Sequence, residues 1–211
     1  IAREYGARVV FETKKGVCCA RQSGVLVARS DIIVSTDADS TFPTDWLNNI
    51  YQAFDQDHKT LAVFGPFQYE KKPKWGRMYS NLLFKATGYF YFKRFKLIYG
   101  AASNLAFRKS AWKEIGGYNT SLAQGGDEID LLTRLDNKGG LVRYLPKNKV
   151  FTSSRRLHKG LLYNIFISLL GYYILDYYIV ARLTGRTIFG QWPSYRETHS
   201  KKSFVFSSVY I

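Results

Sequence analysis

Two aspartates, Asp37 and Asp39, stand one residue apart shortly after an apolar run at residues 32–35. A β-branched run without charge predicts a strand buried on both faces, and in open α/β sheets ligands bind beyond the carboxyl ends of such strands. Carboxylate oxygens at that position suit Mg²⁺ or Mn²⁺, which would bridge the oxygens of a diphosphate. The ordinary alternative is that one aspartate caps the following turn while the other faces solvent.

A second acidic group, Asp127, Glu128 and Asp130, lies at the start of a predicted helix within a basic half of the chain. Residues 66–211 carry 24 basic and 8 acidic side chains (net +16), whereas residues 1–65 carry 7 and 8 (net −1). An acidic group inside a basic half of the chain needs an explanation of its own. Negative charge at a helix N-terminus favours the helix dipole, so a structural role accounts for the position.

The elements that would position these carboxylates alternate between strands and helices. Short β-branched runs predict strands, amphipathic stretches predict helices, and their alternation predicts an α/β fold. We expect strands at residues 7–12, 32–35, 61–65 and within 100–108, and helices at residues 17–28, 46–54, 77–92, 110–115 and 127–135.

The composition narrows the class of protein. The 211 residues include 31 Lys and Arg against 16 Asp and Glu, a formal charge of +15, and 46% of them are hydrophobic. The hydrophobic content excludes wholesale disorder, and the charge indicates an anionic partner such as nucleic acid, anionic lipid or a phosphorylated substrate. The only cysteines, Cys18 and Cys19, are adjacent, which predicts small buried side chains in a reducing compartment and no disulfide or zinc site.

Residues 161–175 carry no charge. As a helix they would reach about 22 Å, short of the hydrocarbon core of about 30 Å, and an extension to residue 181 would include Asp176. One helical face carries the small or polar residues Asn164, Ser168 and Gly171. This pattern favours an interfacial or re-entrant helix, with a membrane span and a buried core helix as alternatives.

Together these motifs resemble the family 2 glycosyltransferases, which are nucleotide-diphospho-sugar transferases with the GT-A fold. The pattern Gly-x-x-x-Ala-Arg-x-x-Gly at residues 16–24, followed by the strand that leads to Asp37 and Asp39, is similar to the donor side of that family. Further similar segments follow in the family's order at residues 100–108, 115–118, 126–131 and 153–156. The resemblance covers residues 7–160 and implies a GT-A-like mixed sheet with helices on both faces.

The resemblance also implies site residues. Asp37 and Asp39 would hold Mg²⁺ or Mn²⁺ and the sugar diphosphate. Glu128, with Asp127, falls where the family has the general base for an inverting displacement, although the order Asp-Glu leaves open which carboxylate is the base. The remaining candidates are Arg155 and Arg156 for the leaving diphosphate, His158 as a further metal ligand, and Asn104 and Arg108 in the acceptor pocket. Surface or structural roles are the alternatives for these five residues.

Two segments of the family are missing ahead of residue 7: the first strand with its Pro-x-x-Asn-Glu pattern, and the second strand with its Asp. Because they supply the nucleobase and ribose contacts, we expect either a piece of a longer enzyme or a truncated relative with poor catalysis. The chain is then divided into an N-terminally incomplete GT-A-like glycosyltransferase domain at residues 1–160 and a membrane-associating C-terminal segment at residues 161–211.

The leading interpretation is transfer of a sugar from a nucleotide-diphospho-sugar to a hydroxyl acceptor, lipid-linked or part of a cell-envelope glycan. We expect this at the cytoplasmic face of the plasma membrane, with an anionic membrane surface as a partner and no nucleic acid. One alternative is a catalytically inactive truncated relative that acts as a membrane scaffold. Another is a basic, aromatic-rich nucleic-acid-binding module, which would leave both acidic groups unexplained.

Overall fold

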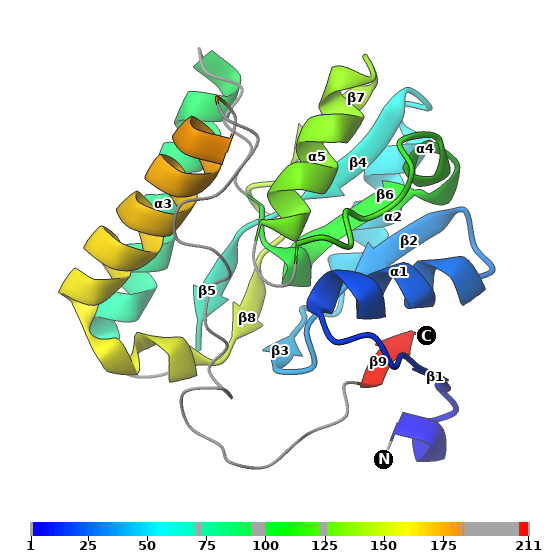
Figure 1. Ribbon diagram of the computed structural model, residues 1–211, viewed down its shortest axis with the longest axis horizontal. Helices are drawn as coiled ribbons and strands as arrows, with labels where there is room; N and C mark the ends of the chain where they lie inside the picture. Colours follow the sequence, from blue (N-terminus) through cyan, green and yellow to red (C-terminus); the bar gives the residue numbers. More distant parts are fainter. Residues whose placement is uncertain are drawn as a thin grey trace.

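The computed structural model of the chain describes residues 2–70, 73–93, 100–122, 126–181, 183 and 207–210. Its centre is a four-stranded mixed sheet with the strand order β2-β6-β4-β7 (Figure 1). Strand β6 runs antiparallel to both β2 and β4, whereas β4 and β7 are parallel. The strands are β2 (Ile32–Ser35), β6 (Leu105–Arg108), β4 (Thr60–Phe64) and β7 (Leu141–Tyr144).

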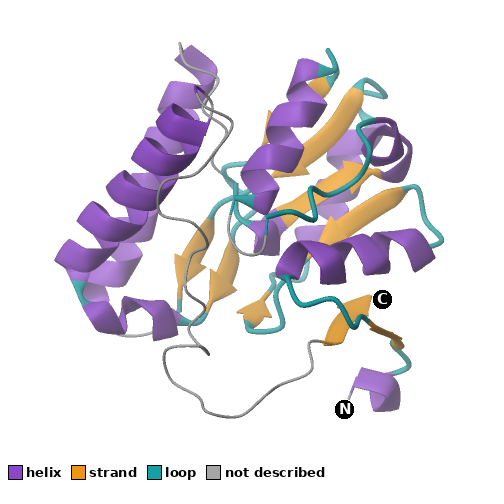
Figure 2. Ribbon diagram, in the orientation of Figure 1, coloured by secondary structure: helices purple, strands orange, loops and turns teal. Residues whose placement is uncertain are grey.

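Helices cover both faces of this sheet (Figure 2). Successive side chains of a strand point to opposite faces, so each face of the sheet carries its own hydrophobic cluster, which the helices bury. Ile33 faces the cluster that includes Val25 of α1 and Leu131 of α5, while its neighbour Val34 packs against the cluster around Ile50 of α2. The helices on the first face are α1 (Val17–Val27), α4 (Lys109–Glu114) and α5 (Asp127–Asn137), and α2 (Trp46–Asp55) covers the second. Cys18 and Cys19 are free and buried on α1, as their sequence predicts.

A second, three-stranded sheet has the order β3-β8-β5. It consists of β3 (Ser40–Thr41), β8 (Val150–Thr152) and β5 (Phe67–Tyr69). Ser40 pairs with Thr152 in the antiparallel ladder of β3 and β8. This pairing brings the segment after β8, the 3₁₀ helix η3 (Ser154–Lys159), close to the turn that leads into β3.

Two helices form a separate layer at one side of the molecule, on the left in Figure 1: α3 (Lys74–Lys93) and η4 (Tyr163–Ala181), a helix of the wider π type. Helix η4 begins two residues after the start of the uncharged stretch at residues 161–175. Within the described part of the chain, no helix is both long enough and apolar enough to cross a membrane.

The predicted strand at residues 7–12 forms, but it lies outside the central sheet. β1 (Arg8–Phe11) pairs antiparallel with β9 (Ser207–Tyr210) from the other end of the sequence. The alternation of elements predicted the strand correctly, whereas its partner lies almost 200 residues away and carries no local signal. Two short 3₁₀ helices complete the described elements, η1 (Ala2–Tyr5) and η2 (Ala102–Asn104).

Candidate functional site

Asp37 and Asp39 lie in the turn between the two sheets. β2 ends at Ser35, β3 begins at Ser40, and the turn between them is closed by a hydrogen bond from the Ser40 amide to the Asp37 carbonyl of 3.1 Å. The side chains of Asp37 and Asp39 are 44% and 27% exposed. Both carboxylates therefore stand beyond the carboxyl end of a central strand and remain within reach of a ligand.

Arg21, on α1, joins the two acidic groups of the chain. Its Nη2 donates to Oδ1 of Asp37 over 3.0 Å, and its Nη1 donates to Oδ2 of Asp127 at the start of α5. Only 12% of the Arg21 side chain is exposed. Burial by itself would lower the pKa of Arg21, but the charges of Asp127 and Asp37 outweigh it and raise the pKa above its usual value. Arg21 is therefore a permanent cation between two carboxylates about 90 positions apart in the sequence.

The first turn of α5 buries two adjacent carboxyl groups in different surroundings. Asp127 is 4% exposed and bound to Arg21, whereas Glu128 is 7% exposed. Burial, followed by the negative charge of Asp127 and a hydrogen bond with it, raises the pKa of Glu128 well above the ordinary 4.5. Asp127 thus compensates a cation, and Glu128 is a carboxylate whose affinity for a proton is raised by its surroundings. A raised proton affinity suits Glu128 to the role of a general base.

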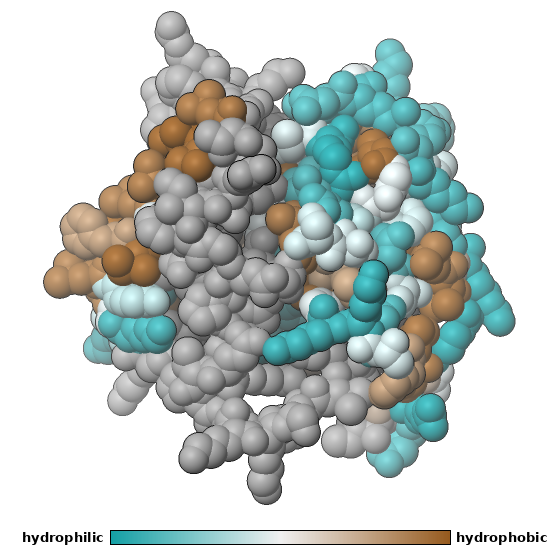
Figure 3. Space-filling view, viewed as in Figure 1, coloured by the Kyte–Doolittle hydropathy of each residue, from teal (hydrophilic) through white to brown (hydrophobic). Residues whose placement is uncertain are grey.

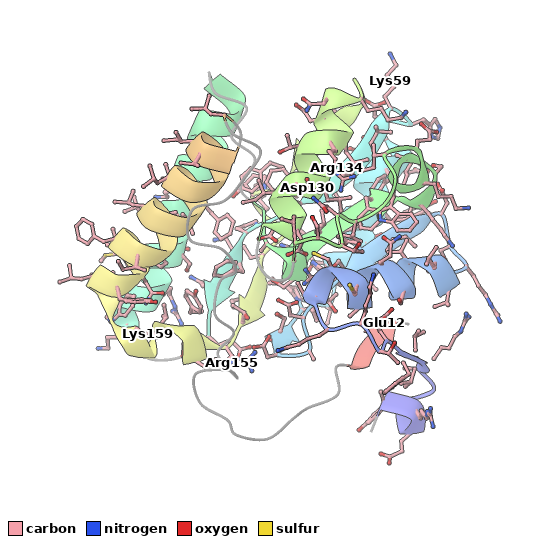
Figure 4. All side chains as sticks on the ribbon, in the orientation of Figure 1. Glu12, Lys59, Asp130, Arg134, Arg155 and Lys159 are labelled. Atoms are coloured by element: carbon pink, nitrogen blue, oxygen red, sulfur yellow. The ribbon has the colours of Figure 1, made fainter. Side chains whose placement is uncertain are left out.

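Asp130, the third member of the acidic group, belongs to a separate structural contact on α5 (Figure 4). Nη2 and Nε of Arg134 donate to its Oδ2 over 2.5 and 2.9 Å. Nη1 of Arg134 then reaches the carbonyl of Ile115 over 2.8 Å. This chain of contacts fastens α5 to the end of α4, so the acidic group divides into a pair at the site and a residue that supports the helix.

Arg155 reaches the site from η3, as the β3–β8 pairing leads one to expect. Its Nη2 lies 2.9 Å from Oδ2 of Asp39, and the hydroxyl of Ser153 accepts a hydrogen bond from its backbone amide. The side chains of Arg156 and His158 lie outside the described residues, so their predicted roles stay predictions.

Asn104 is buried and uses its side chain within the protein. Its Nδ2 donates to the carbonyls of Pro66 and Asn148 over 3.0 and 2.6 Å, and its Oδ1 accepts from Nε1 of Trp46 over 2.9 Å. A Cβ at Gly65 would lie 2.4 Å from the same amide nitrogen. Asn104 therefore fixes the loop after β4, and its predicted contact with an acceptor remains untested.

Arg108 lies at the other end of the central sheet from Asp37. It pairs with Asp31, the residue before β2, at 3.2 Å and donates to the carbonyl of Thr60 over 3.0 Å. Its guanidinium also stacks over the ring of Phe54, 5.3 Å from the ring centre. The structure does not bring Arg108 together with the carboxylates.

The donor set at the turn fits a hard divalent cation. Magnesium sites in proteins typically use one or two carboxylates together with substrate phosphates and water. Asp37 pairs with Arg21 through Oδ1 and Asp39 pairs with Arg155 through Oδ2, so each aspartate brings a carboxylate and a cation to the turn. Among the described residues, no group of three or more His, Cys, Asp or Glu side chains could hold a metal ion by itself. A cation here would complete its coordination with oxygens of the substrate.

Comparison with known proteins defines the class. Residues 1–116, more than half of the chain, match the family described as Glycosyl transferase family 2. The chain belongs to this family, which confirms the resemblance seen in the sequence motifs.

The chain spans less than half the length of two similar proteins. The glucosyl-dolichyl phosphate glucuronosyltransferase of Haloferax volcanii is 24% identical over 123 residues, which make up 56% of this chain and 39% of that protein. The structure of mannosyltransferase PcManGT from Pyrobaculum calidifontis, in complex with GDP-Man and Mn²⁺, matches with a TM-score of 0.50 and 21% identity. It covers 69% of this chain and 39% of the other, and it supports the predicted GT-A-like α/β fold.

The motif that contains Arg21 assigns no role to this residue. The available signal is its spacing on the helix: Arg21 follows Cys18 by three residues and precedes Val25 by four, so it lies on the helix face that packs on the core. Its two partners depend on the packing of α1 against α5, which no local pattern reveals.

Proposed function

We propose that this chain carries the reaction site of an inverting glycosyltransferase, which moves a sugar from a nucleotide-diphospho-sugar to a hydroxyl acceptor. The observation that carries the proposal is the Arg21 bridge. One guanidinium binds both Asp37, on the proposed donor side, and Asp127, the neighbour of the proposed base Glu128. The two acidic groups of the sequence therefore form one site, as a direct displacement between donor and acceptor requires.

Glu128 is the proposed general base. Its buried carboxylate takes the proton of the acceptor hydroxyl while the acceptor oxygen forms a bond to the anomeric carbon. The bond between that carbon and the diphosphate oxygen breaks on the opposite face, so the configuration inverts. Asp127 stays paired with Arg21, and its negative charge raises the proton affinity of Glu128.

Asp37 and Asp39 would hold Mg²⁺ or Mn²⁺, which when bound neutralises charge on the leaving diphosphate. Arg155 contributes a second cation beside Asp39. An arginine offers planar, paired donors to phosphate oxygens, so Arg155 can bind the diphosphate directly. Arg156 and His158 are proposed to support the same region.

We propose a lipid-linked acceptor that offers a hydroxyl group, and a place at the cytoplasmic face of the plasma membrane. The support for the acceptor is the name of the similar Haloferax volcanii protein, a glucosyl-dolichyl phosphate glucuronosyltransferase. The support for a reducing compartment is the pair of free, buried cysteines. The sugar acceptor could also be a growing cell-envelope glycan, which presents the same hydroxyl chemistry.

Calorimetric titration of the chain with UDP- and GDP-sugars, with and without Mn²⁺, tests the donor side. We expect Mn²⁺-dependent binding that Asp39→Asn abolishes and that the matched variant Asp45→Asn retains, since Asp45 is exposed on α2 and pairs with Asn49. Binding that is independent of both Mn²⁺ and Asp39 would contradict the proposed donor site.

A further inference from the structure

Helix η4 presents an apolar side chain row to solvent. Its inner side packs on α3: the hydroxyl of Tyr79 donates to the carbonyl of Asn164 over 3.2 Å, and Leu169 packs against Leu83 and Phe84. Asn164 is 6% exposed, so this polar side chain points into the protein. The outer row, named here the η4 ridge, is 41–70% exposed and consists of Leu162, which directly precedes the helix, and of Phe166, Ile167, Leu170, Ile174, Leu175 and Ile179.

The ridge follows the geometry of the helix. Most of its members recur every four or five residues, which is close to one turn of a π-type helix, so they lie along one side. Figure 3 shows hydrophobic side chains gathered along the left of the molecule, where η4 lies in the same view. A continuous row of large exposed apolar side chains is unusual for a soluble surface and marks a contact with a protein or a membrane.

Helix α3 extends this surface. Met78 and Leu82 are 65% and 68% exposed, and Leu82 is the i+3 neighbour of Tyr79, which contacts η4. The flank of α3 that faces η4 therefore adds further apolar area beside the ridge.

Basic side chains border the apolar surface, and we call them the basic rim: Lys74, Arg77, Lys85 and Lys159. All four are exposed. The sequences of α3 and η4 together contain a single acidic residue, Asp176. Lys159 lies at the lower end of the layer in Figure 4, where the apolar surface in Figure 3 gives way to hydrophilic atoms. Apolar side chains beside unopposed cations match the two chemical layers of an anionic lipid surface.

We propose that the η4 ridge and the basic rim bind the surface of an anionic lipid bilayer, with η4 lying in the plane of the headgroups. Among the described side chains of η4, Leu169 and the backbone of Asn164 contact α3, whereas the ridge faces solvent, so the ridge is the face that the helix offers to lipid. Nucleic acid would match the rim but not the ridge. A second copy of this chain would match the ridge but would bring two basic rims together.

This surface deepens the proposed function, on which its catalytic consequence rests. η3 joins the site directly to the ridge: Arg155 binds Asp39, and Lys159 of the rim follows four residues later, just before η4. A bilayer bound at the ridge would therefore present the hydroxyl group of a lipid-linked acceptor beside the carboxylates.

Vesicle flotation of the full chain tests the surface. Wild-type protein should bind vesicles of phosphatidylcholine mixed with phosphatidylglycerol, and the ridge variant F166S/L170S should bind them at least about tenfold more weakly. The rim variant Lys74→Glu with Lys85→Glu should lose roughly tenfold on the mixed vesicles and nothing on phosphatidylcholine alone. The matched control L26S/L47S changes two side chains that are 59% and 58% exposed on α1 and α2, and it should bind like wild type.

Equal binding of the ridge variant and wild type would overturn the proposal. So would a wild-type dimer in sedimentation velocity that F166S/L170S converts to a monomer, because the ridge would then be covered by a second copy. Circular dichroism melting confirms that each variant is folded. Donor binding measured by calorimetry is independent of these results, so a failure of the lipid surface is distinguishable from a failure of the glycosyltransferase site.

Discussion

Replacement of Arg21 by Met should destabilise the protein more than any loss of a surface ion pair. Asp127 is 4% exposed, and in this variant it would keep its charge without the cation that compensates it. Removal of one partner of a buried ion pair costs about 3–5 kcal/mol. The total free energy of unfolding of a single domain is about 5–15 kcal/mol, so the loss is a large fraction of the total.

Two controls separate charge compensation from lost packing. Lys138→Met breaks the pair between Lys138 and Glu114, whose side chains are 37% and 55% exposed, and should cost no more than about 1 kcal/mol. The double variant Arg21→Met with Asp127→Asn removes both charges and should recover roughly half of the loss.

Urea unfolding followed by tryptophan fluorescence suits this comparison, because Trp46 and Trp112 are 5% and 2% exposed in the folded state. Lost packing alone would also lower the free energy of unfolding of Arg21→Met. Charge compensation of Asp127 by Arg21 would be refuted if Arg21→Met lowered the free energy of unfolding no more than Lys138→Met, or if the double variant were no more stable than Arg21→Met.

Further predictions concern three individual side chains. Burial raises the pKa of Glu128 above 4.5 in the folded state, so its stabilising contribution is complete below that pH and is lost as the pH rises through the raised pKa. Glu128→Gln should therefore raise the free energy of unfolding at neutral pH and not at acidic pH; equal effects at both, in urea titrations, would contradict this. The same variant should lower turnover by about 10²–10⁴-fold, whereas Asp130→Asn should lower it far less. Asn104→Leu leaves the indole of Trp46 and two carbonyls without their partner, and each such group costs about 1–3 kcal/mol; a thermal melt like that of wild type would exclude this role. Burial, aided by the charge of Asp127, raises the pKa of the Cys18 thiol to about 12, so iodoacetamide at mildly alkaline pH should leave Cys18 unmodified until urea unfolds the protein; rapid labelling of the native chain, seen by mass spectrometry, would show otherwise.

The local elements were predictable because hydrophobic pattern and propensity act over a few residues. The strand at residues 32–35 has the same bounds in the structure, and the helix predicted at residues 46–54 ends one residue later, at Asp55. The helix predicted at residues 77–92 begins three residues earlier, at Lys74, directly after Pro73, and it includes Gly76. Helix ends are harder to predict than helix interiors, because the ends depend on a few residues.

The arrangement of the sheet was less predictable. An apolar β-branched run predicts burial on both faces whether its neighbours are parallel or antiparallel, and β2 is in fact antiparallel to β6. The pairing of β1 with β9 depends on a contact between opposite ends of the sequence, to which local patterns contribute nothing.

The candidate site also combines residues that local patterns predict with contacts that depend on the packing of distant elements. The order of the motifs was enough to select Asp37, Asp39 and the pair Asp127 and Glu128 as candidates, because carboxylates in that order resemble the glycosyltransferase family. Their connection through Arg21 follows from helix packing and was not visible in the sequence. For Arg108, the motif predicted a contact in the acceptor pocket, with a structural role as the alternative. The β2–β6 pairing places Arg108 beside Asp31, at the end of the strand away from Asp37, and its contact with an acceptor stays a prediction.

The central claim is that Asp39 belongs to the donor side and Glu128 to the base of one glycosyl transfer site. Turnover of nucleotide-sugar and Mn²⁺-dependent donor binding, measured side by side in wild type, Asp39→Asn and Glu128→Gln, test it most directly. We predict that both variants lose turnover, that Asp39→Asn also loses donor binding, and that Glu128→Gln retains it. Wild-type turnover in Glu128→Gln, or undiminished Mn²⁺-dependent binding in Asp39→Asn, would contradict the account.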